Sequence, residues 1–165
     1  VGIVGYGNIG KKLKFVLDTF SITNSVYDPF LDHNFLSNIN TIKECDLISL
    51  HVPLTQKTLF PTFKLVDQVF IDDISNRTLI NTSRGPIINE NDLVEVLKDE
   101  KIAGAGLDVY DNEPLSQDHK LRFLPNALLL PHIGYVTAEN YSKFYLQMIE
   151  NLESCLKNKP LRLIS

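Results

Sequence analysis

Residues 1–20, VGIVGYGNIGKKLKFVLDTF, contain the pattern that decides the fold. Residues 1–4 predict a buried strand, GYGNIG follows at 5–10, and the amphipathic run 9–20 predicts a helix. In this order Gly5 permits a tight turn, Gly7 admits a pyrophosphate close to the backbone, and Gly10 lets the helix pack on the strand. The N–H groups that open the helix then face an anion. The stretch therefore predicts a phosphate-binding turn, although a glycine-rich turn without a ligand is the alternative.

Asp28 supports the ligand-binding interpretation of this turn. It ends the next predicted strand, 25–27, eighteen residues after Gly10. A carboxylate at this place can accept hydrogen bonds from both ribose hydroxyls of an adenosine, whereas the alternative is a solvated turn acid before Pro29. It would repel a 2′-phosphate, and residues 29–32, PFLD, contain no Arg or Lys to offset that repulsion. The sequence thus predicts NAD(H) in preference to NADP(H).

The rest of the chain alternates short β-branched runs with longer amphipathic runs. Strands are expected at 1–4, 25–27, 47–51, 78–81, 105–109 and 127–130, and helices at 9–20, 90–98 and 138–157. Asn89 and Thr137 are the expected N-caps of the last two helices, Asn89 with Asp92 three residues on. Pro61 breaks any early helix in the region 55–76, where 65–71 predicts one or two helical turns. The pattern indicates an α/β fold with a doubly wound parallel sheet.

The bulk composition excludes several classes of partner. The chain has 165 residues and a formal charge of −4 that is spread along it, so no basic stripe predicts nucleic-acid binding. No apolar run approaches the length of about 20 residues that a membrane span needs. Cys45 and Cys155 lie far apart without metal-ligand spacing, which is typical of reduced intracellular thiols. We expect a cytoplasmic protein with no metal site, no membrane contact and no nucleic acid.

Three segments after the middle of the chain follow predicted strand ends: NTSRG at 81–85, GLDVYDNEP at 106–114 and PHIG at 131–134. Ligands bind at the carboxyl ends of the strands in open α/β sheets, so these loops are expected to converge. Arg84 can bind a carboxylate through two hydrogen bonds, His132 can exchange a proton near neutral pH, and Glu113 can orient the ring and favour imidazolium. Taken singly, each is equally well a surface arginine, a solvated acid or a satisfied polar side chain. As a set they predict a site for a 2-keto or 2-hydroxy acid.

These motifs resemble a known family. GYGNIG with Asp28, HVPLT at 51–55, NTSRGPIIN, GAGLDVYDNEP and LLLPHIG are similar in order and spacing to the D-isomer-specific 2-hydroxyacid dehydrogenases, among them phosphoglycerate, glycerate, formate and D-lactate dehydrogenases. The resemblance covers almost the whole chain and implies a Rossmann NAD-binding domain over 1–165. It implies that Arg84 holds the substrate carboxylate and keto oxygen, that His132 is the general acid/base, and that Glu113 is its partner.

The resemblance also implies a cofactor site. It places Asp108 beside the nicotinamide carboxamide and the Thr82 backbone near it, although Asp108 is alternatively a capped strand end. The expected cofactor-binding residues are Gly5, Gly7, Asn8, Ile9, Gly10, Asp28, Pro53, Thr82 and Asp108.

The implied reaction passes a hydride from the nicotinamide to the 2-keto carbon. Protonated His132 donates to the developing alkoxide while Arg84 stabilises its charge, and oxidation of the 2-hydroxy acid runs in reverse. Relatives pair through the nucleotide domain, so the resemblance implies a homodimer. The alternatives are an NAD(H)-sensing binding module of the corepressor type without turnover, and a truncated gene product.

Two departures from the family pattern bear on function. The spacing between His51 and Arg84 is longer than expected, with LFPTFKLVDQVF at 59–70. This stretch resembles the 4-phosphoerythronate dehydrogenase branch, whereas GAGLDVYDNEP resembles the general family, so no substrate is assigned. The chain also begins at Val1 inside a strand, and we expect the substrate domain to be absent from it. The chain by itself is then expected to bind NAD(H) but to turn over slowly or not at all, because the reacting carbonyl lacks its enclosing wall.

Overall fold

The computed structural model describes residues 1–31, 38–159 and 161. The chain divides into two compact units, Val1–His132 and Ile133–Ser165. The first contains the sheet and every predicted site residue. The second contains one long helix, and each unit is described by itself below.

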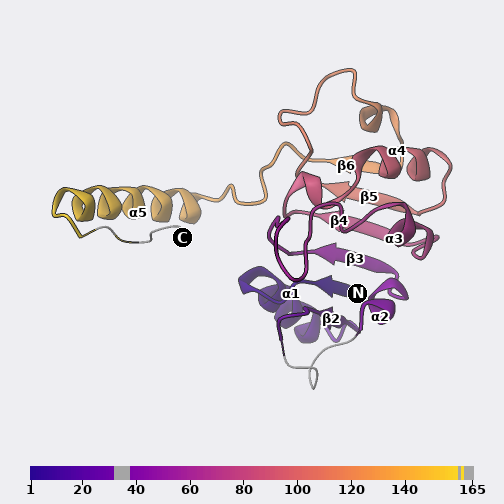
Figure 1. The fold of residues 1–165 in the computed structure, drawn as a ribbon, viewed down its shortest axis with the longest axis horizontal. Helices are drawn as coiled ribbons and strands as arrows, with labels where there is room; N and C mark the ends of the chain where they lie inside the picture. The colour runs from indigo at the N-terminus through magenta and orange to yellow at the C-terminus, as the bar shows by residue number, and fades with distance from the viewer. Residues whose placement is uncertain (32–37, 160, 162–165) are drawn as a thin grey trace. The chain divides into compact units, whose positions relative to one another are not determined.

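A six-stranded sheet, parallel throughout, forms the centre of the first unit (Figure 1). Its strand order is β2-β1-β3-β4-β5-β6. The strands are β1 (Gly2–Val4), β2 (Ser25–Tyr27), β3 (Leu47–Leu50), β4 (Thr78–Asn81), β5 (Gly104–Leu107) and β6 (Ala127–Leu129). The chain runs outward from β1 to β2 and then crosses back to β3 on the other side of β1. This reversal confirms the doubly wound prediction and leaves a crevice at the carboxyl ends of β1 and β3.

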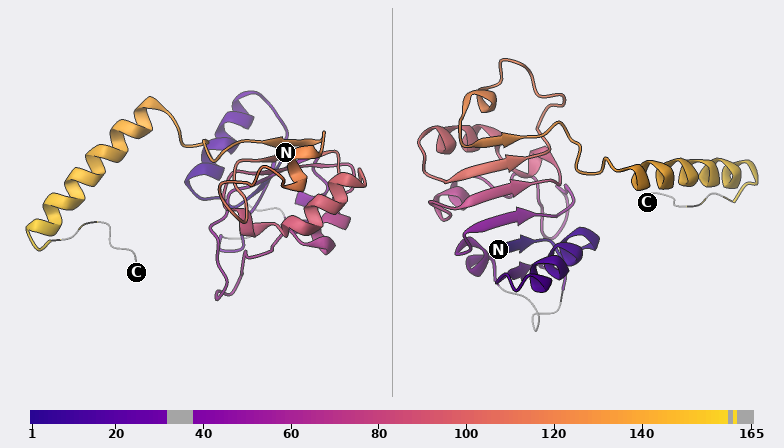
Figure 2. Two further views of the ribbon diagram at one scale, coloured as in Figure 1. Left: turned by 90° about the horizontal axis from the view of Figure 1, so that it is seen from above. Right: turned by 180° about the vertical axis from the view of Figure 1, so that it is seen from behind.

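Helices cover both faces of the sheet, because neighbouring strand residues point to opposite sides. Ile3 packs with Leu17 of α1 (Asn8–Thr19) on one face. Val4 belongs to the larger core on the other face. That core is covered by α2 (Ile39–Lys43), α3 (Gln68–Asp72) and α4 (Glu90–Lys98). Figure 2 shows α1 and α4 on opposite sides of the strands. Two 3-10 turns, η2 (Gly85–Ile87) and η3 (Lys120–Phe123), lie in the loops that follow β4 and β5.

The observed elements confirm the six predicted strands and three predicted helices, with ends that differ by at most two residues. The helix α3 at 68–72 overlaps the predicted turns at 65–71. The short helix α2 was not predicted. The prediction that the Asn89 side chain accepts a backbone hydrogen bond at the start of α4 is wrong. Asn89 holds the cap position without a side-chain bond, and the Asp92 carboxylate accepts from the Gln68 N–H at 3.0 Å, which ties α4 to α3.

The second unit consists of α5 (Ala138–Leu156) and its flanking residues. The predicted cap is confirmed, because Thr137 Oγ1 accepts from the Asn140 N–H at 3.1 Å. No helix within the described ranges is both long and apolar enough to span a membrane.

Candidate active site

The turn after β1 has the geometry that a pyrophosphate site needs. Gly5 adopts a φ of +95°, which L side chains rarely adopt. A Cβ on Gly10 would lie 2.1 Å from the Gly5 carbonyl oxygen, so only glycine lets α1 pack this closely. At Gly7, by contrast, a Cβ would meet nothing within 4 Å. Gly5 and Gly10 therefore shape the turn, while Gly7 keeps the start of α1 open to an anion.

Asp28 lies at the end of β2 beside this turn. Its carboxylate accepts from the Tyr6 N–H at 2.8 Å and from the Phe30 N–H at 3.1 Å. Each bond involves a different oxygen, which holds the carboxylate in one orientation and leaves each oxygen a further lone pair for a ribose hydroxyl. The turn and Asp28 thus fit an adenosine diphosphate group.

Two adjoining pockets follow the carboxyl ends of the strands. One, of about 330 Å³, brings together Gly5, Gly7, Asp28 and Pro53. The other, of about 430 Å³, brings together Ile9, Pro53, Thr82 and Arg84. Both pockets share His51, Val52 and Pro53. Six of the nine predicted cofactor residues thus line these two pockets, which share residues 51–53 and are together termed the groove.

The remaining three predicted cofactor residues lie outside the lining of these pockets. Gly10 is buried beneath the turn, and Asn8 is exposed in the first turn of α1. Asp108 is only 3% exposed just after β5, where its N–H donates to the Asn81 carbonyl at 3.0 Å.

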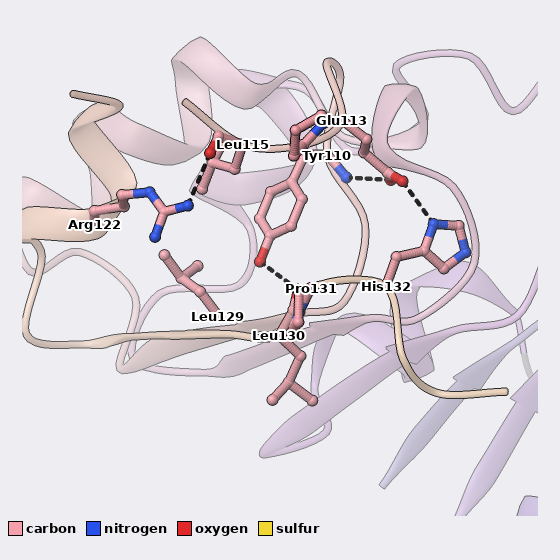
Figure 3. A pocket seen from close by; sticks show the side chains of 9 residues that line it. Tyr110, Glu113, Leu115, Arg122, Leu129, Leu130, Pro131 and His132 are labelled. Atoms are coloured by element: carbon pink, nitrogen blue, oxygen red, sulfur yellow. Dashed lines mark hydrogen bonds and ion pairs between the residues drawn. The ribbon is translucent and has the colours of Figure 1, made fainter. Parts of the chain in front are cut away.

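Glu113 and His132 form the chemical centre of the site. Glu113 Oε2 lies 2.6 Å from His132 Nδ1, and Glu113 Oε1 accepts from the Tyr110 N–H at 3.0 Å (Figure 3). His132 has a φ of 54°, a left-handed conformation that few non-glycine residues adopt and that histidine adopts more often than most. With Nδ1 bonded to the carboxylate, Nε2 becomes the ring nitrogen suited to exchange a proton with a ligand.

The charge state of Glu113 follows from these contacts. Partial burial acts to raise the pKa of Glu113, but the hydrogen bonds from His132 and from the Tyr110 N–H, and then the charges of His132 and Arg84, outweigh it. The pKa of Glu113 therefore lies below its ordinary value. At neutral pH the residue is a carboxylate, which lies against His132 Nδ1 and orients the ring.

This lowered pKa predicts a pH-dependent contribution to stability. The unfolded chain binds more protons than the folded one between the two pKa values of Glu113, so stability rises with pH in that window. The contribution is complete above about pH 4.3, the usual glutamate value, and disappears as pH falls through the lower folded pKa. We expect less than about 1 kcal/mol, because the Glu113 side chain is 34% exposed and screened. Urea unfolding from pH 3 to 6 should show that the difference between wild type and Glu113→Gln shrinks toward acid pH; a constant difference would contradict it.

Arg84 lies on the loop after β4, next to the loop that carries Glu113. The two loops are in close contact, since a Cβ on Gly85 would lie 2.0 Å from the Tyr110 carbonyl. Buried Asn81 orders the first loop: its amide accepts from the Ser83 N–H at 3.0 Å and donates to the Arg84 carbonyl at 2.9 Å. Arg84 is exposed, and its guanidinium donates to the Ser83 carbonyl at 2.6 Å. The structure thus brings Glu113 and His132 into contact, whereas Arg84 lines the pocket that contains Thr82 and acts on Glu113 only through its charge.

A pocket of about 490 Å³ adjoins the Glu113–His132 pair (Figure 3). Tyr110 contributes its ring, and its hydroxyl donates to the Leu130 carbonyl at 2.8 Å. Arg122 lines the pocket while it bonds the Leu115 carbonyl at 2.8 Å. No group of three or more His, Cys, Asp or Glu side chains that could hold a metal occurs among the described residues.

Comparison with known proteins shows the family to which the chain belongs. A family model described as the D-isomer specific 2-hydroxyacid dehydrogenase, NAD binding domain, matches residues 1–134. The chain belongs to this family.

Individual 2-hydroxyacid dehydrogenases are similar to the chain over most of its length. The erythronate-4-phosphate dehydrogenase of Wigglesworthia glossinidia brevipalpis is 37% identical over 157 residues, which are 92% of this chain and 41% of that protein. The hydroxypyruvate reductase of Blautia hydrogenotrophica is 32% identical over 174 residues, 100% of this chain and 52% of that protein. The chain therefore spans about half the length, or less, of these curated relatives.

A solved structure agrees with the NAD-binding fold. The NAD-dependent formate dehydrogenase of Staphylococcus aureus in complex with NAD superposes with a TM-score of 0.89 at 28% identity, over 99% of this chain and 51% of that one. This likeness agrees with the NAD-binding domain that the family model describes.

Some residues of the dehydrogenase groove were not singled out from the sequence. His51 lines both cofactor pockets, and its Nε2 lies 2.9 Å from Ser49 Oγ. Burial lowers the pKa of His51, which favours its neutral form beside the groove. Its motif, HVPLT, was noted only for its family resemblance. Phe30 and Phe60 also line the Asp28 pocket, and no sequence pattern linked these two rings.

Proposed function

We propose that residues 1–165 are the NAD(H)-binding, catalytic-residue-bearing domain of an oxidoreductase that transfers hydride between NAD(H) and a D-2-hydroxy acid or 2-keto acid. The observation that carries this proposal is the contact of 2.6 Å between Glu113 Oε2 and His132 Nδ1 at the carboxyl edge of the sheet. A carboxylate–imidazole pair of this kind is suited to general acid/base chemistry. Its place beside a groove with the glycine turn and Asp28 supports a nicotinamide-dependent reaction.

The proposed roles follow from the charge of each side chain and from the atoms that it can contact. The bound NADH supplies the hydride. His132 Nε2 donates a proton to the developing alkoxide oxygen, and Glu113 holds Nδ1–H so that the ring keeps its orientation and its positive form is stabilised. Arg84, with five donors in a rigid fork, binds the substrate carboxylate and stabilises the charge on the keto oxygen. In the oxidative direction neutral His132 accepts the proton.

The cofactor residues have separate roles in the same proposal. Gly7 and the start of α1 bind the pyrophosphate, and Asp28 binds the adenosine ribose. By family analogy the Thr82 backbone and Asp108 serve the nicotinamide carboxamide, while Ile9 and Pro53 form apolar walls of the groove. Gly5 and Gly10 hold the turn, and Asn8 contributes a helix-start N–H.

Further features of the whole protein belong to the same proposal. We infer that a separate substrate domain completes the site, and that the last residues of the chain lead back toward it. By family analogy the protein is a cytoplasmic homodimer. Its partner is a small 2-keto or 2-hydroxy acid rather than nucleic acid or a membrane.

Turnover tests the proposed function directly. The purified full-length protein, with its substrate domain, is expected to consume NADH with at least one 2-keto acid from a panel that includes glyoxylate and hydroxypyruvate. The nicotinamide absorbance follows the reaction. Tight NADH binding without turnover of any 2-keto acid by the whole protein would favour an NAD(H)-sensing module.

Asp28 provides the test of cofactor preference. We expect wild type to bind NADH more tightly than NADPH, because the carboxylate repels a 2′-phosphate. Asp28→Ala removes the ribose acceptor and should weaken NADH binding about 10- to 100-fold, since hydrogen bonds to a charged group are worth about 1.5–3 kcal/mol. The same variant should narrow the difference between the two cofactors. Calorimetric titration measures both affinities, and equal NADH and NADPH affinity in wild type would overturn the preference.

A further inference from the structure

The Asp28 pocket is lined by two aromatic rings from distant parts of the chain. Phe30 follows β2, and Phe60 lies in the long connection between β3 and α3. Their ring centroids are 5.3 Å apart at an interplanar angle of 89°, an edge-to-face contact. Both rings line the pocket while they remain partly open to solvent, Phe60 at 39% exposure.

Phe60 is carried by a loop that its own threonines close. Thr55 N–H donates to Thr62 Oγ1 at 2.8 Å, and the Thr62 N–H returns to the Thr55 carbonyl at 3.0 Å. The Phe63 N–H donates to the same carbonyl at 2.9 Å. Residues 55–62 therefore form a cross-braced loop, and Phe60 lies at a defined place although the segment has no helix or strand.

Asp28 determines where a bound nucleoside would lie relative to the Phe60 ring. Its carboxylate lines the pocket, and the bonds from the Tyr6 and Phe30 N–H groups hold both oxygens in place to accept from a ribose. A base is attached directly to that ribose, so it must enter the neighbouring part of the pocket. The pocket lining is largely apolar and includes Phe30, Phe60, Pro61 and Leu65.

We propose that Phe60, held opposite Phe30 by the 55–62 loop, is the specificity-determining wall on which the adenine ring of NAD(H) stacks. The inference rests on the proposed function and adds to it a residue from the segment that departs from the family pattern. A purine presents a wide π-face to an aromatic side chain, and such stacking is sensitive to removal of the ring. The smaller ring of a pyrimidine gains less from the same wall.

The test is a calorimetric titration of the full chain with NADH, with ADP-ribose, and with the dinucleotide analogue in which uracil replaces adenine. Wild type is expected to prefer adenine over uracil. Phe60→Ala should weaken NADH and ADP-ribose binding about tenfold and remove most of that preference. Phe60→Tyr keeps the ring and should remain within about twofold of wild type for NADH.

Phe63→Ala is the matched control, because Phe63 belongs to the same segment but lies against Lys64, at 5.7 Å from its Nζ, and does not line the pocket. It should bind all three ligands as wild type does. Unchanged NADH affinity in Phe60→Ala overturns the inference, and so does an equal loss for the adenine and uracil ligands, which would indicate a displaced loop. Absence of NADH and ADP-ribose binding in folded wild type would instead refute the proposed cofactor function itself.

Discussion

Replacement of His132 by Asn is expected to lower kcat for 2-keto-acid reduction by about 10³-fold while the affinity for NADH stays within about twofold. General acid/base catalysis by a placed side chain contributes about 10²–10⁴-fold, and an asparagine amide cannot donate a proton to a developing alkoxide. The cofactor groove is lined by residues other than His132, which belongs to the neighbouring pocket. Steady-state kinetics with NADH and the best 2-keto acid, together with a titration of NADH, measures both quantities.

Glu113→Gln separates the role of the carboxylate from that of the ring. An amide can still accept from His132 Nδ1 but carries no charge to stabilise imidazolium. We therefore expect a smaller fall in kcat, and a reductive pH profile whose active range contracts toward acid pH. An unchanged pH profile in Glu113→Gln would show that the carboxylate only positions the ring.

His119→Asn is a suitable control for these substitutions. His119 lies on the same loop between β5 and β6 and pairs with Glu90 at 3.0 Å, yet it lines none of the site pockets. Its loss should leave kcat per folded molecule near the wild-type value. Full activity in His132→Asn, or an equal loss in His119→Asn, would show that the reaction does not use His132 as proposed.

The parts of the fold that sequence patterns predicted are those governed by local periodicity and by glycine. Gly5 needs a positive φ, and Gly10 has no room for a Cβ, so the motif and its structural cause coincide. The missed helix α2 is only five residues long, too short for an amphipathic period to emerge. Asn89 has a typical capping side chain, but Asp92, expected to support that cap, instead bonds Gln68 in another helix. Such tertiary partners are not visible in a local pattern.

The site was predictable to the extent that topology alone brings residues together. Arg84, Glu113 and His132 follow neighbouring parallel strands, so their approach follows from the strand order. The internal supports of the site were not predictable. The amide of Asn81 orders the Arg84 loop, and the threonines at 55 and 62 brace the Phe60 loop through side-chain hydrogen bonds. These bonds depend on exact loop conformations, which no hydrophobic period specifies.

Gly10→Ala is expected to lower the stability of the fold, whereas Gly7→Ala is expected to lower the affinity for NADH, although both residues lie in one hexapeptide. A Cβ on Gly10 would lie 2.1 Å from the Gly5 carbonyl oxygen, which is backbone and cannot rotate away. Overpacking of this kind costs about 3 kcal/mol or more, so Gly10→Ala should lower Tm by roughly 6–12 °C. A Cβ on Gly7 meets nothing within 4 Å, and its φ of −75° suits alanine. Gly7→Ala should therefore change the free energy of unfolding by less than about 1 kcal/mol.

For cofactor binding, in contrast to stability, a large effect is expected from Gly7→Ala. Its Cβ would stand where the pyrophosphate approaches the start of α1, so Gly7→Ala should weaken NADH binding about 10- to 100-fold in a protein that is otherwise stable. Thermal unfolding and calorimetric titration of both variants provide the comparison. Normal NADH affinity in Gly7→Ala would mean that the anion does not approach the backbone at Gly7. Wild-type stability in Gly10→Ala would mean that α1 can move away from the turn, and the close packing of helix on strand would then not explain the third glycine.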